Sequence, residues 1–390
     1  MIDFDRNATA PLHPLARVAM TALLEDRGLG NPSSVHRPGQ RARAIVEQGR
    51  EAIARATGGA AGDVVLTSGG TEADALAIAG VVRGLAATGR PCGLACTAIE
   101  HPAVTGTAAA LRREGREVVT IPTDREGRIH AEDLARVLRE HPGIGQVSIT
   151  AAHHELGNVT PIADLVRAIR DVREDIVVHT DAVQAFGKTR LSMRDAGVDL
   201  LSISAHKIGG PAGIGALLCA RHVPITPLWG GGAQQAGRRP GTESAILTAG
   251  FAAAATVAAA EQGEWAARVR PLGDRLRAGL ESLGAALYGD RATHLGNTAL
   301  VGFAGCDGHL AMMALDLAGF ACSTGAACSA GTIEASAVLR ALGDDSRTAR
   351  TALRFSIGAE HSEADIDALL AALPPILAAV RAASADLEVA

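Results

Sequence analysis

The feature that most constrains the fold is a regular alternation of short apolar runs and longer helical segments between residues 64 and 220. Short apolar runs that end at turn residues are typical of buried strands. The expected strands are Val64–Thr67, Leu94–Thr97, Val118–Ile121, Val147–Thr150, Ile176–Thr180, Leu200–Ser204 and Gly213–Ala220. Helices are expected between most of them, at 73–87, 103–113, 131–139 and 161–172. Strands that alternate with helices of about 10–15 residues imply an α/β fold with a mainly parallel sheet and crossover helices.

The regular alternation of expected strands and helices ends near residue 243. An alanine-rich helix is expected at 243–262 and a second helix at 265–282, after which strands and helices follow in a different order. The later elements are strands near 298–303 and 352–357 and helices at 308–317 and 362–382. We therefore expect a large domain over residues 15–255. A smaller α+β domain would comprise residues 1–14, an extended arm, together with residues 256–390.

Composition excludes several classes of function. The 390-residue chain has a net charge of −5, which argues against direct nucleic-acid binding and against a membrane surface. Its six cysteines form no C-x-x-C pair and no metal-finger spacing, so reduced thiols, a cytoplasmic location and no metal site are expected. The N-terminus does not resemble a signal peptide, and the apolar run 251–260 is too short to cross a bilayer.

One lysine stands where a lysine is unusual. The apolar strand at 200–204 is followed by Ser204-Ala205-His206-Lys207 and then by glycines, which places Lys207 just past a strand end at the rim of the core. Burial lowers the pKa of a lysine, and such an amine can form a Schiff base with a carbonyl cofactor. The alternative is a solvated loop lysine, the commoner case.

Polar side chains also follow the other strands, and ligands bind at the carboxyl ends of strands in open parallel sheets. A glycine turn with Gly70 and Thr71 opens a helix and can bind an anion through its free N–H groups. The other groups are Glu100 and His101, His153, His154 and Glu155, Asp181 and Gln184, and Ser204 and His206. Core histidines and a helix N-cap aspartate are the plain alternatives.

Together these groups fit an aromatic aldehyde phosphate. The glycine turn, Thr71, Ser204 and His206 would hold the phosphate, and Asp181 would keep a pyridine nitrogen protonated. Lys207 would form the imine, which is the protein's share of pyridoxal phosphate (PLP) chemistry.

The motifs resemble those of cysteine desulfurases of the NifS/IscS type, in the class V aminotransferase-like family of PLP fold type I. The resemblance runs nearly end to end. It is carried by Asn7-Ala8-Thr9, Gly30-Asn31-Pro32-Ser33-Ser34-x-His36, Thr67-Ser68-Gly69-Gly70-Thr71-Glu72, Asp181-Ala182-x-Gln184, Ser204-x-His206-Lys207, Gly237-x-Arg239-x-Gly241-Thr242 and Ser323-x-Gly325-x-Ala327-Cys328.

The resemblance implies a role for each cofactor residue. Lys207 would hold PLP, His101 would stack on its ring, and Gln184 would bond the phenolic oxygen. Thr242 would reach the phosphate in the partner subunit, which implies a homodimer.

The resemblance also implies the substrate, L-cysteine, and its binding residues. Arg354 lies in an alternating strand, and an arginine fork suits a substrate carboxylate; a surface arginine on an edge strand is the alternative. Asn7 and His154 would join it in binding substrate. Cys328 would attack the substrate sulfur as a thiolate, with His101 as a proton carrier. The products would be alanine and a persulfide on Cys328 that passes to a protein sulfur acceptor. Cys92, Cys96 and Cys322 are interpreted as packing residues.

Some positions depart from the family pattern. His154 stands where the family usually has asparagine, next to the cofactor's phenolic oxygen and the substrate carboxylate, so it would bind cofactor as well as substrate. Because imidazole can titrate near neutral pH, His154→Asn is expected to keep PLP bound and to shift the cofactor's pH-dependent absorbance. The other departures are Ala75, Gly209, Ala233, Gln235 and Ala236.

Two other classes of function stay open. One is a different PLP reaction on the same scaffold, such as a selenocysteine lyase or an amino-acid epimerase. The other is a PLP-binding scaffold of a sulfur-transfer complex. The destination of the sulfur is also open between iron–sulfur cluster assembly, tRNA thiolation and DNA phosphorothioation.

Overall fold

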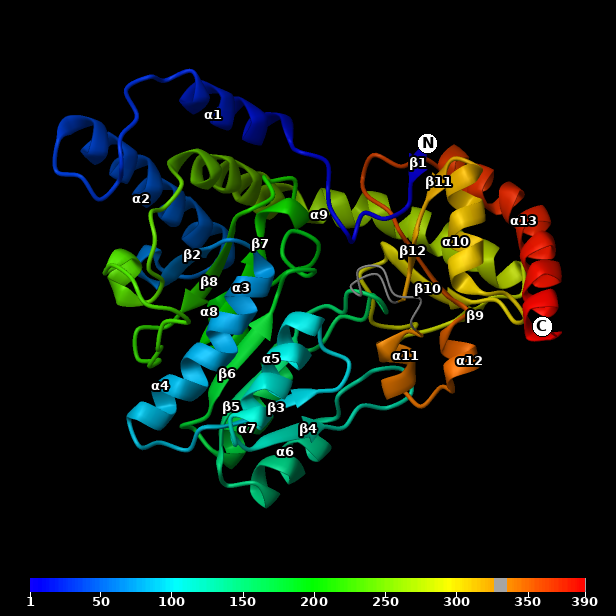
Figure 1. Ribbon diagram of the computed structural model, residues 1–390, viewed down its shortest axis with the longest axis horizontal. Coiled ribbons are helices and arrows are strands. Elements are labelled where there is room, and N and C mark those ends of the chain that lie inside the picture. The colour runs from blue at the N-terminus through cyan, green and yellow to red at the C-terminus, as the bar shows by residue number, and fades with distance from the viewer. Residues whose placement is uncertain (326–334, 390) are drawn as a thin grey trace.

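The computed structural model describes residues 1–325 and 335–389 and contains a large seven-stranded sheet and a smaller four-stranded one (Figure 1). The large sheet has the order β2-β8-β7-β6-β5-β3-β4. Neighbouring strands from β7 to β4 run parallel, whereas β8 is antiparallel to both β2 and β7. The strands are β2 (Val64–Thr67), β3 (Gly93–Thr97), β4 (Val118–Ile121), β5 (Ile144–Thr150), β6 (Val177–Asp181), β7 (Leu200–Ser204) and β8 (Gly215–Cys219). The expected α/β fold with a mainly parallel sheet is confirmed.

Helices cover both faces of this sheet, as the alternation of side chains along each strand requires. In β7, Leu201 and Ile203 belong to one core cluster, while Leu200 belongs to a second cluster on the other face. The first face is covered by α2 (Arg37–Thr57), α6 (Ala131–Glu140), α7 (Ile162–Val172), α8 (Met193–Ala196) and the first half of α9 (Ala245–Ser282). The second face is covered by α3 (Gly70–Ala75), the π-helical turn η2 (Leu76–Gly80), α4 (Val81–Ala87) and α5 (Pro102–Arg113).

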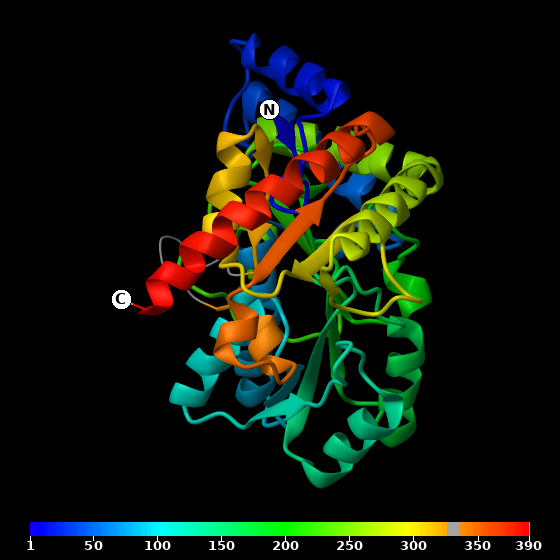
Figure 2. The same ribbon diagram turned by 90° about the vertical axis from the view of Figure 1, so that its right-hand side faces the viewer.

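The smaller sheet has the order β12-β13-β10-β9, with antiparallel neighbours. Its strands are β9 (Ala286–Leu287), β10 (Thr298–Gly302), β12 (Ser323–Thr324) and β13 (Ala352–Ser356). The helices of this region are α10 (Gly308–Leu317), α11 (Ala337–Ala341), α12 (Ser346–Ala349) and α13 (Glu363–Val389). Figure 2 shows α13 lying along β13. Leu353 and Phe355 of β13 form a core with the apolar faces of α10, α13 and the second half of α9.

The N-terminal arm joins the smaller region before it reaches the larger one. The strand β1 (Ile2–Asp3) pairs in parallel with β11 (Phe320–Ala321), and Phe4 is fully buried in the smaller core. The short helix α1 (Pro14–Leu24) then packs against α9.

The helix α9 corrects one expectation. We expected two helices, at 243–262 and 265–282, but the chain forms a single helix from Ala245 to Ser282. A glycine such as Gly263 weakens a helix by only about 1 kcal/mol, which tertiary packing offsets. Phe251 packs in the larger core and Leu276 in the smaller, so α9 links the two. The expected domain boundary at 255/256 falls inside this helix and stays a prediction.

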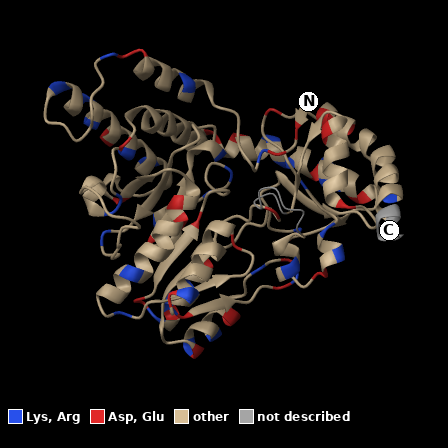
Figure 3. Cartoon of the chain, in the orientation of Figure 1, with Lys and Arg blue, Asp and Glu red and all other residues tan. Residues whose placement is uncertain are grey.

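Two helices in the described part of the chain are long and apolar enough to cross a membrane, α9 and residues Glu363–Ser384. The apolar run at 251–260 is therefore part of a longer apolar helix than we expected. Core helices of soluble proteins meet the same criterion, and both helices place leucines in the smaller core, Leu276 from α9 and Leu369 and Leu373 from α13. Figure 3 shows acidic and basic residues interspersed over the molecule.

Candidate active site

A cavity of about 300 Å³ lies at the carboxyl ends of β5, β6 and β7, beneath the N-terminal arm. It brings together almost all the predicted site residues, from positions 7 to 354 of the chain. Those that line it are Asn7, Gly70, Thr71, His101, His154, Asp181, Gln184, Ser204, His206, Lys207 and Arg354. This is where ligands bind in open α/β sheets.

Two predicted residues are not among them. Thr242 is exposed and does not line the cavity. Cys328 lies outside the described residues.

Lys207 is the last residue of a short 3-10 turn, η3 (Ala205–Lys207), that follows β7 directly. Its Nζ atom donates to the backbone carbonyl oxygens of Asn7, at 2.6 Å, and Ala8, at 2.9 Å. The side chain therefore points into the cavity and is held by the N-terminal arm. The alternative of a solvated loop lysine does not fit this placement.

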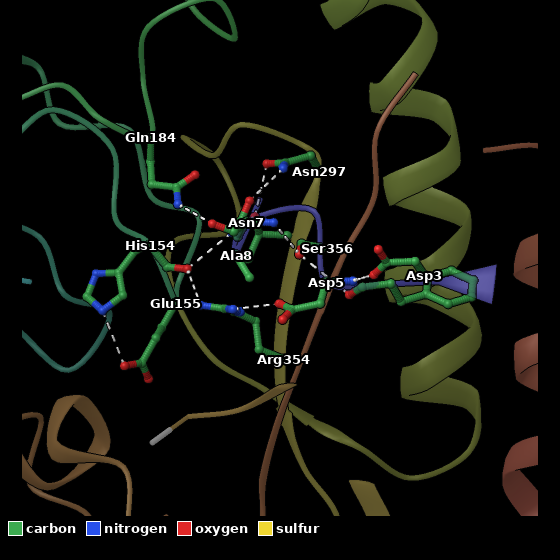
Figure 4. Close-up of polar contacts among 12 residues, drawn as sticks. Asp3, Asp5, Asn7, Ala8, His154, Glu155, Gln184, Asn297, Arg354 and Ser356 are labelled. Carbon is green, nitrogen blue, oxygen red and sulfur yellow. Dashed lines mark hydrogen bonds and ion pairs between the residues drawn. The ribbon is translucent and has the colours of Figure 1, made fainter. Parts of the chain in front are cut away.

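Asn7 fixes the arm over the cavity. Its Nδ2 group donates to the His154 carbonyl oxygen at 3.1 Å and to Thr298 Oγ1 at 2.9 Å, and its Oδ1 atom accepts from Asn297 at 3.0 Å (Figure 4). The residue is buried, with 1% of its surface exposed. Its amide is thus bonded within the protein, and its expected contact with substrate stays a prediction.

One end of the cavity is suited to a phosphate. The α3 helix begins at Gly70. A Cβ atom at this position would lie 2.7 Å from Val183 Cγ2, so this close approach requires glycine. The Oγ atom of Ser204 is buried without a hydrogen-bond partner among the described residues. An unpaired buried hydroxyl is costly, and a bound phosphate oxygen would satisfy it. Thr71 and His206 line the same cavity.

Buried carboxyl groups lie at the floor. Asp181, at the end of β6, accepts a hydrogen bond from the Val183 N–H group, and Asp74 lines the cavity beside it. Burial raises the pKa of Asp181 to about 6. Burial and then the charge of Asp181 raise the pKa of Glu100 to about 8 and that of Asp74 well above its usual value. A buried group of this kind favours a positively charged partner such as a protonated pyridine nitrogen.

Three histidine rings lie next to one another at one side of the cavity, which His101 and His154 line. The His153 and His154 rings are stacked with centroids 4.7 Å apart, and the edge of His101 meets His154 at 5.2 Å. The Nδ1 atom of His153 accepts from the Glu155 and Leu156 N–H groups, so its Nε2 atom must carry the proton that it donates to the Ile99 carbonyl oxygen. His153 is therefore a core histidine, the plainer of the two interpretations.

The expected titration of His154 near neutral pH is wrong. Burial, and then the charge of Arg354, lower the pKa of His154 to about 3. Burial lowers the pKa of His101 to about 3 as well, with His154 as the next cause. Both rings are therefore neutral near pH 7. The Nε2 atom of His154 lies 3.4 Å from Glu155 Oε1.

Arg354 is buried in β13 and is not a surface arginine. Its Nη2 atom lies 2.7 Å from Asp5 Oδ1, and Nη1 donates to the His154 carbonyl oxygen at 3.1 Å (Figure 4). The Nε atom has no hydrogen-bond partner among the described residues. The guanidinium is thus oriented by the protein, and its N–H groups that form neither of these bonds, the Nε–H group among them, can donate to a carboxylate.

Sequence reasoning missed Asp5, Asp74 and Lys188. Asp74 lies one helical turn after Thr71, a spacing that could have identified it. The packing interpretation of Cys96 and Cys322 is supported, because burial raises the pKa of both thiols to about 12. No metal-ligating cluster of three or more side chains is found in the described part of the chain.

The fold and the cavity define the class of protein, an α/β enzyme of PLP fold type I. The solved structure of a NifS-like protein superimposes with a TM-score of 0.89 at 32% identity, over 97% of this chain and 99% of that one. A structure of SspA in complex with cysteine superimposes with a TM-score of 0.77 at 28% identity, over 93% and 100%. The IscS-like cysteine desulfurase of Mycobacterium tuberculosis is 39% identical over 98% of both chains.

The aminotransferase class-V family matches residues 2–369. The chain belongs to this PLP-dependent family and within it to the cysteine desulfurases of the NifS/IscS type, as its motifs indicated.

Proposed function

We propose that this protein is a PLP-dependent cysteine desulfurase, which converts L-cysteine to L-alanine and leaves a persulfide on Cys328. The observation that carries the proposal is the single cavity into which Lys207, Asp181 and Arg354 all point. An amine for the cofactor aldehyde, a carboxyl group for its ring nitrogen and a guanidinium for the substrate carboxylate are the groups that this reaction needs.

The residues present fit PLP. The Gly70 turn, Thr71, Ser204 and His206 would hold its phosphate, and Gln184 would bond the phenolic oxygen. Asp181 would keep the ring nitrogen protonated, His101 would stack on the ring, and Lys207 would bind the aldehyde carbon. When bound, PLP withdraws electrons from the substrate Cα and so makes its C–H bond acidic.

The chain's own groups then carry out the transfer. Arg354 binds the substrate carboxylate, with Asn7 and His154 beside it, and the Lys207 amine accepts the Cα proton. The Cys328 thiolate attacks the substrate sulfur, an S–S bond forms and the Cβ–S bond breaks with its electron pair left on the carbon side. The Cβ atom takes up a proton, and the Lys207 ammonium group returns a proton to Cα, which gives alanine. The Nδ1 atom of His101 accepts from the Ala103 N–H group, so in the neutral ring the Nε2 atom carries the proton and can donate it in a hydrogen bond. As a proton carrier the ring would act with a pKa lowered to about 3 by burial. No external oxidant is required.

A homodimer in the cytoplasm is part of the proposal. Exposed apolar side chains gather on α1 and the loop that follows it, namely Leu15, Val18, Leu24 and Val35. Exposed apolar patches of this kind mark association surfaces. In the dimer, Thr242 would reach the partner's phosphate site. The persulfide sulfur would pass to a protein acceptor, for iron–sulfur cluster assembly or a thiolation pathway.

The test is to incubate the purified protein with PLP, L-cysteine and a thiol reductant, and to measure alanine and sulfide per subunit. We expect multiple turnovers, a borohydride-trapped PLP adduct at Lys207, and loss of sulfide release in Cys328→Ala. An epimerase would be unaffected by Cys328→Ala, and a scaffold would form no alanine. Selenocysteine tested alongside cysteine would reveal a lyase, which would turn over only the selenium compound.

A further inference from the structure

Only two of the 37 basic residues of this chain are lysines, Lys188 and Lys207, and both belong to the same site. All the others are arginines. An arginine keeps its charge at every accessible pH, whereas the amine of a lysine can lose its proton and is shaped as a compact point donor. The exclusive use of lysine at these two positions suggests that both are needed for their amine.

Lys188 is buried beside the cavity, in the turn that follows β6, with 8% of its surface exposed. Its Nζ atom donates to Gln184 Oε1 at 2.6 Å and approaches Asn7 Oδ1 at 3.4 Å. Its backbone carbonyl oxygen accepts from Gln262 of α9, which holds this turn in place. In the described part of the chain no carboxylate forms an ion pair with Lys188. A buried amine of this kind costs stability, so a function at the site is the better explanation for it.

The position of the Lys188 amine settles the orientation of the Gln184 amide. The ammonium form of Lys188 only donates, so the atom 2.6 Å away is the amide oxygen, and the Asn7 carbonyl oxygen, which can only accept, requires the amide nitrogen on the other side. The Nε2 group of Gln184 is then turned the other way, where it donates to the Asn7 carbonyl oxygen at 2.9 Å. The same carbonyl oxygen accepts from Lys207. Lys188, Gln184, Asn7 and Lys207 therefore form one hydrogen-bonded chain.

We propose that Lys188 is a positioning residue of the active site, which holds Oε1 of Gln184 so that the amide N–H group faces the cofactor's phenolic oxygen. The inference rests on the proposed function. Without Lys188 the amide can rotate and present its oxygen, which would repel a phenolate. The charged groups that act on Lys188 are Lys207 and Arg354, and burial, followed by these two charges, lowers its pKa to about 7.

The first experiment compares Lys188→Met and Lys188→Arg with the wild type as PLP-loaded proteins. In Lys188→Met we expect PLP still trapped at Lys207 by borohydride, but with its dissociation constant raised about tenfold, as loss of a charged hydrogen bond implies. The midpoint of the pH-dependent absorbance should move to higher pH, because a nearby positive charge has been removed. In Lys188→Arg the midpoint should lie closer to that of the wild type, because the positive charge is kept. Arg170→Met, which removes a half-buried cation far from the cavity, should leave the spectrum unchanged.

A double-mutant cycle separates positioning from mere packing. In a Gln184→Ala background, Lys188→Met should shift the spectrum much less, since the amide through which it acts is gone. A shift of the same size in both backgrounds, or no shift in either, would overturn the proposal. If Lys188→Met does not fold, Lys188→Gln, which keeps a donor without charge, takes its place in the cycle.

The apoprotein offers a readout without cofactor. Labelling with [13Cε]lysine gives two resonances, which Lys188→Arg assigns. We expect the Lys188 resonance to titrate near neutral pH and to move when Gln184 is replaced by alanine. A Lys188 signal that titrates like a solvated lysine would contradict the inference. Failure of the wild type to bind PLP would instead contradict the proposed function.

Discussion

The Nζ atom of Lys207 lies 2.6 Å from the backbone carbonyl oxygen of Asn7, although the two residues are 200 positions apart. The N-terminal arm makes this contact because β1 anchors it in the smaller region and Asn7 then crosses to the end of β7. The active site is therefore built from both sheets, and the N-terminal arm contributes Asp5, Asn7 and Ala8 to it.

Asn7→Ala should weaken both the fold and the site. The substitution removes the buried hydrogen bonds of Asn7 with Thr298 Oγ1 and with the Asn297 amide, at a cost of about 0.5–1.5 kcal/mol for each bond lost, while each partner keeps one other hydrogen bond. We expect a fall in the melting temperature of several degrees and weaker PLP binding. Asp3→Ala in the same arm is the control, because it removes a partly exposed ion pair with Arg6 and the hydrogen bond from the Asp5 N–H group but leaves the buried bonds of Asn7 in place. Equal effects of the two substitutions would contradict this account.

Lys207→Ala should remove both the cofactor link and the base. We expect loss of the trapped PLP adduct and a fall in alanine formation of roughly 10²–10⁴-fold, the usual contribution of a positioned base. Adding methylamine should restore part of the rate, because a free amine can take the proton. Alanine formation at the wild-type rate would mean that another group is the base.

The sequence predicted the site better than it predicted the boundaries between elements. Strand ends such as Thr150, Asp181 and Ser204 could be located because an apolar run stops where polar residues begin, and topology then brings these ends together. The sequence could not predict that α9 is one continuous helix, because packing against two cores overrides the helix-breaking tendency of Gly263.

Contacts between distant segments were also beyond the sequence. The pairing of Arg354 with Asp5 and the burial that keeps His154 neutral depend on how the arm and β13 meet, which no local pattern encodes. Lys188 was overlooked although a simple signal was present, since it is the only lysine besides Lys207.

His154→Asn should keep PLP bound and leave the number of ionisations unchanged. Burial lowers the pKa of His154 to about 3, so the ring is uncharged between pH 5 and 9 and the substitution removes no titrating group there. A shift of the absorbance midpoint is still expected, from the exchanged hydrogen bond, and it should be smaller than that of Lys188→Met. Absorbance titrations of both variants test this. An ionisation near pH 6.5 in the wild type that the variant lacks would contradict it.

Arg354→Lys should impair substrate binding more than cofactor binding. A lysine keeps the positive charge but lacks the planar guanidinium, which bonds Asp5 and the His154 carbonyl oxygen at the same time. We expect KM for cysteine to rise roughly 10- to 100-fold, as loss of a charged hydrogen bond implies. The PLP spectrum should not change. Steady-state kinetics and absorbance of the same preparation decide this, with Arg350→Lys as an exposed control. A changed spectrum with an unchanged KM would place Arg354 at the cofactor instead.

The buried carboxyl groups predict how the stability of the apoprotein depends on pH. Burial raises the pKa of Asp181 to about 6, that of Glu100 to about 8 and that of Asp74 well above its usual value. In the unfolded chain these groups ionise near pH 4, so the folded protein binds more protons between pH 4 and 8. Their contribution to stability is therefore complete below about pH 4 and is lost as the pH rises towards 8.

Asp74→Asn removes one of these groups while keeping its shape. We expect the melting temperature of the apoprotein variant to fall less than that of the wild type between pH 5 and pH 6, a range below the pKa of about 7 to which burial lowers Lys188. Thermal denaturation monitored by circular dichroism at both pH values measures the difference. Asp164→Asn, an exposed acid on α7, serves as the control and should leave the slope unchanged. If the melting temperatures of Asp74→Asn and the wild type fall with pH at the same slope, Asp74 is already ionised in the folded protein. Only a group that stays protonated on folding can make stability fall as the pH rises.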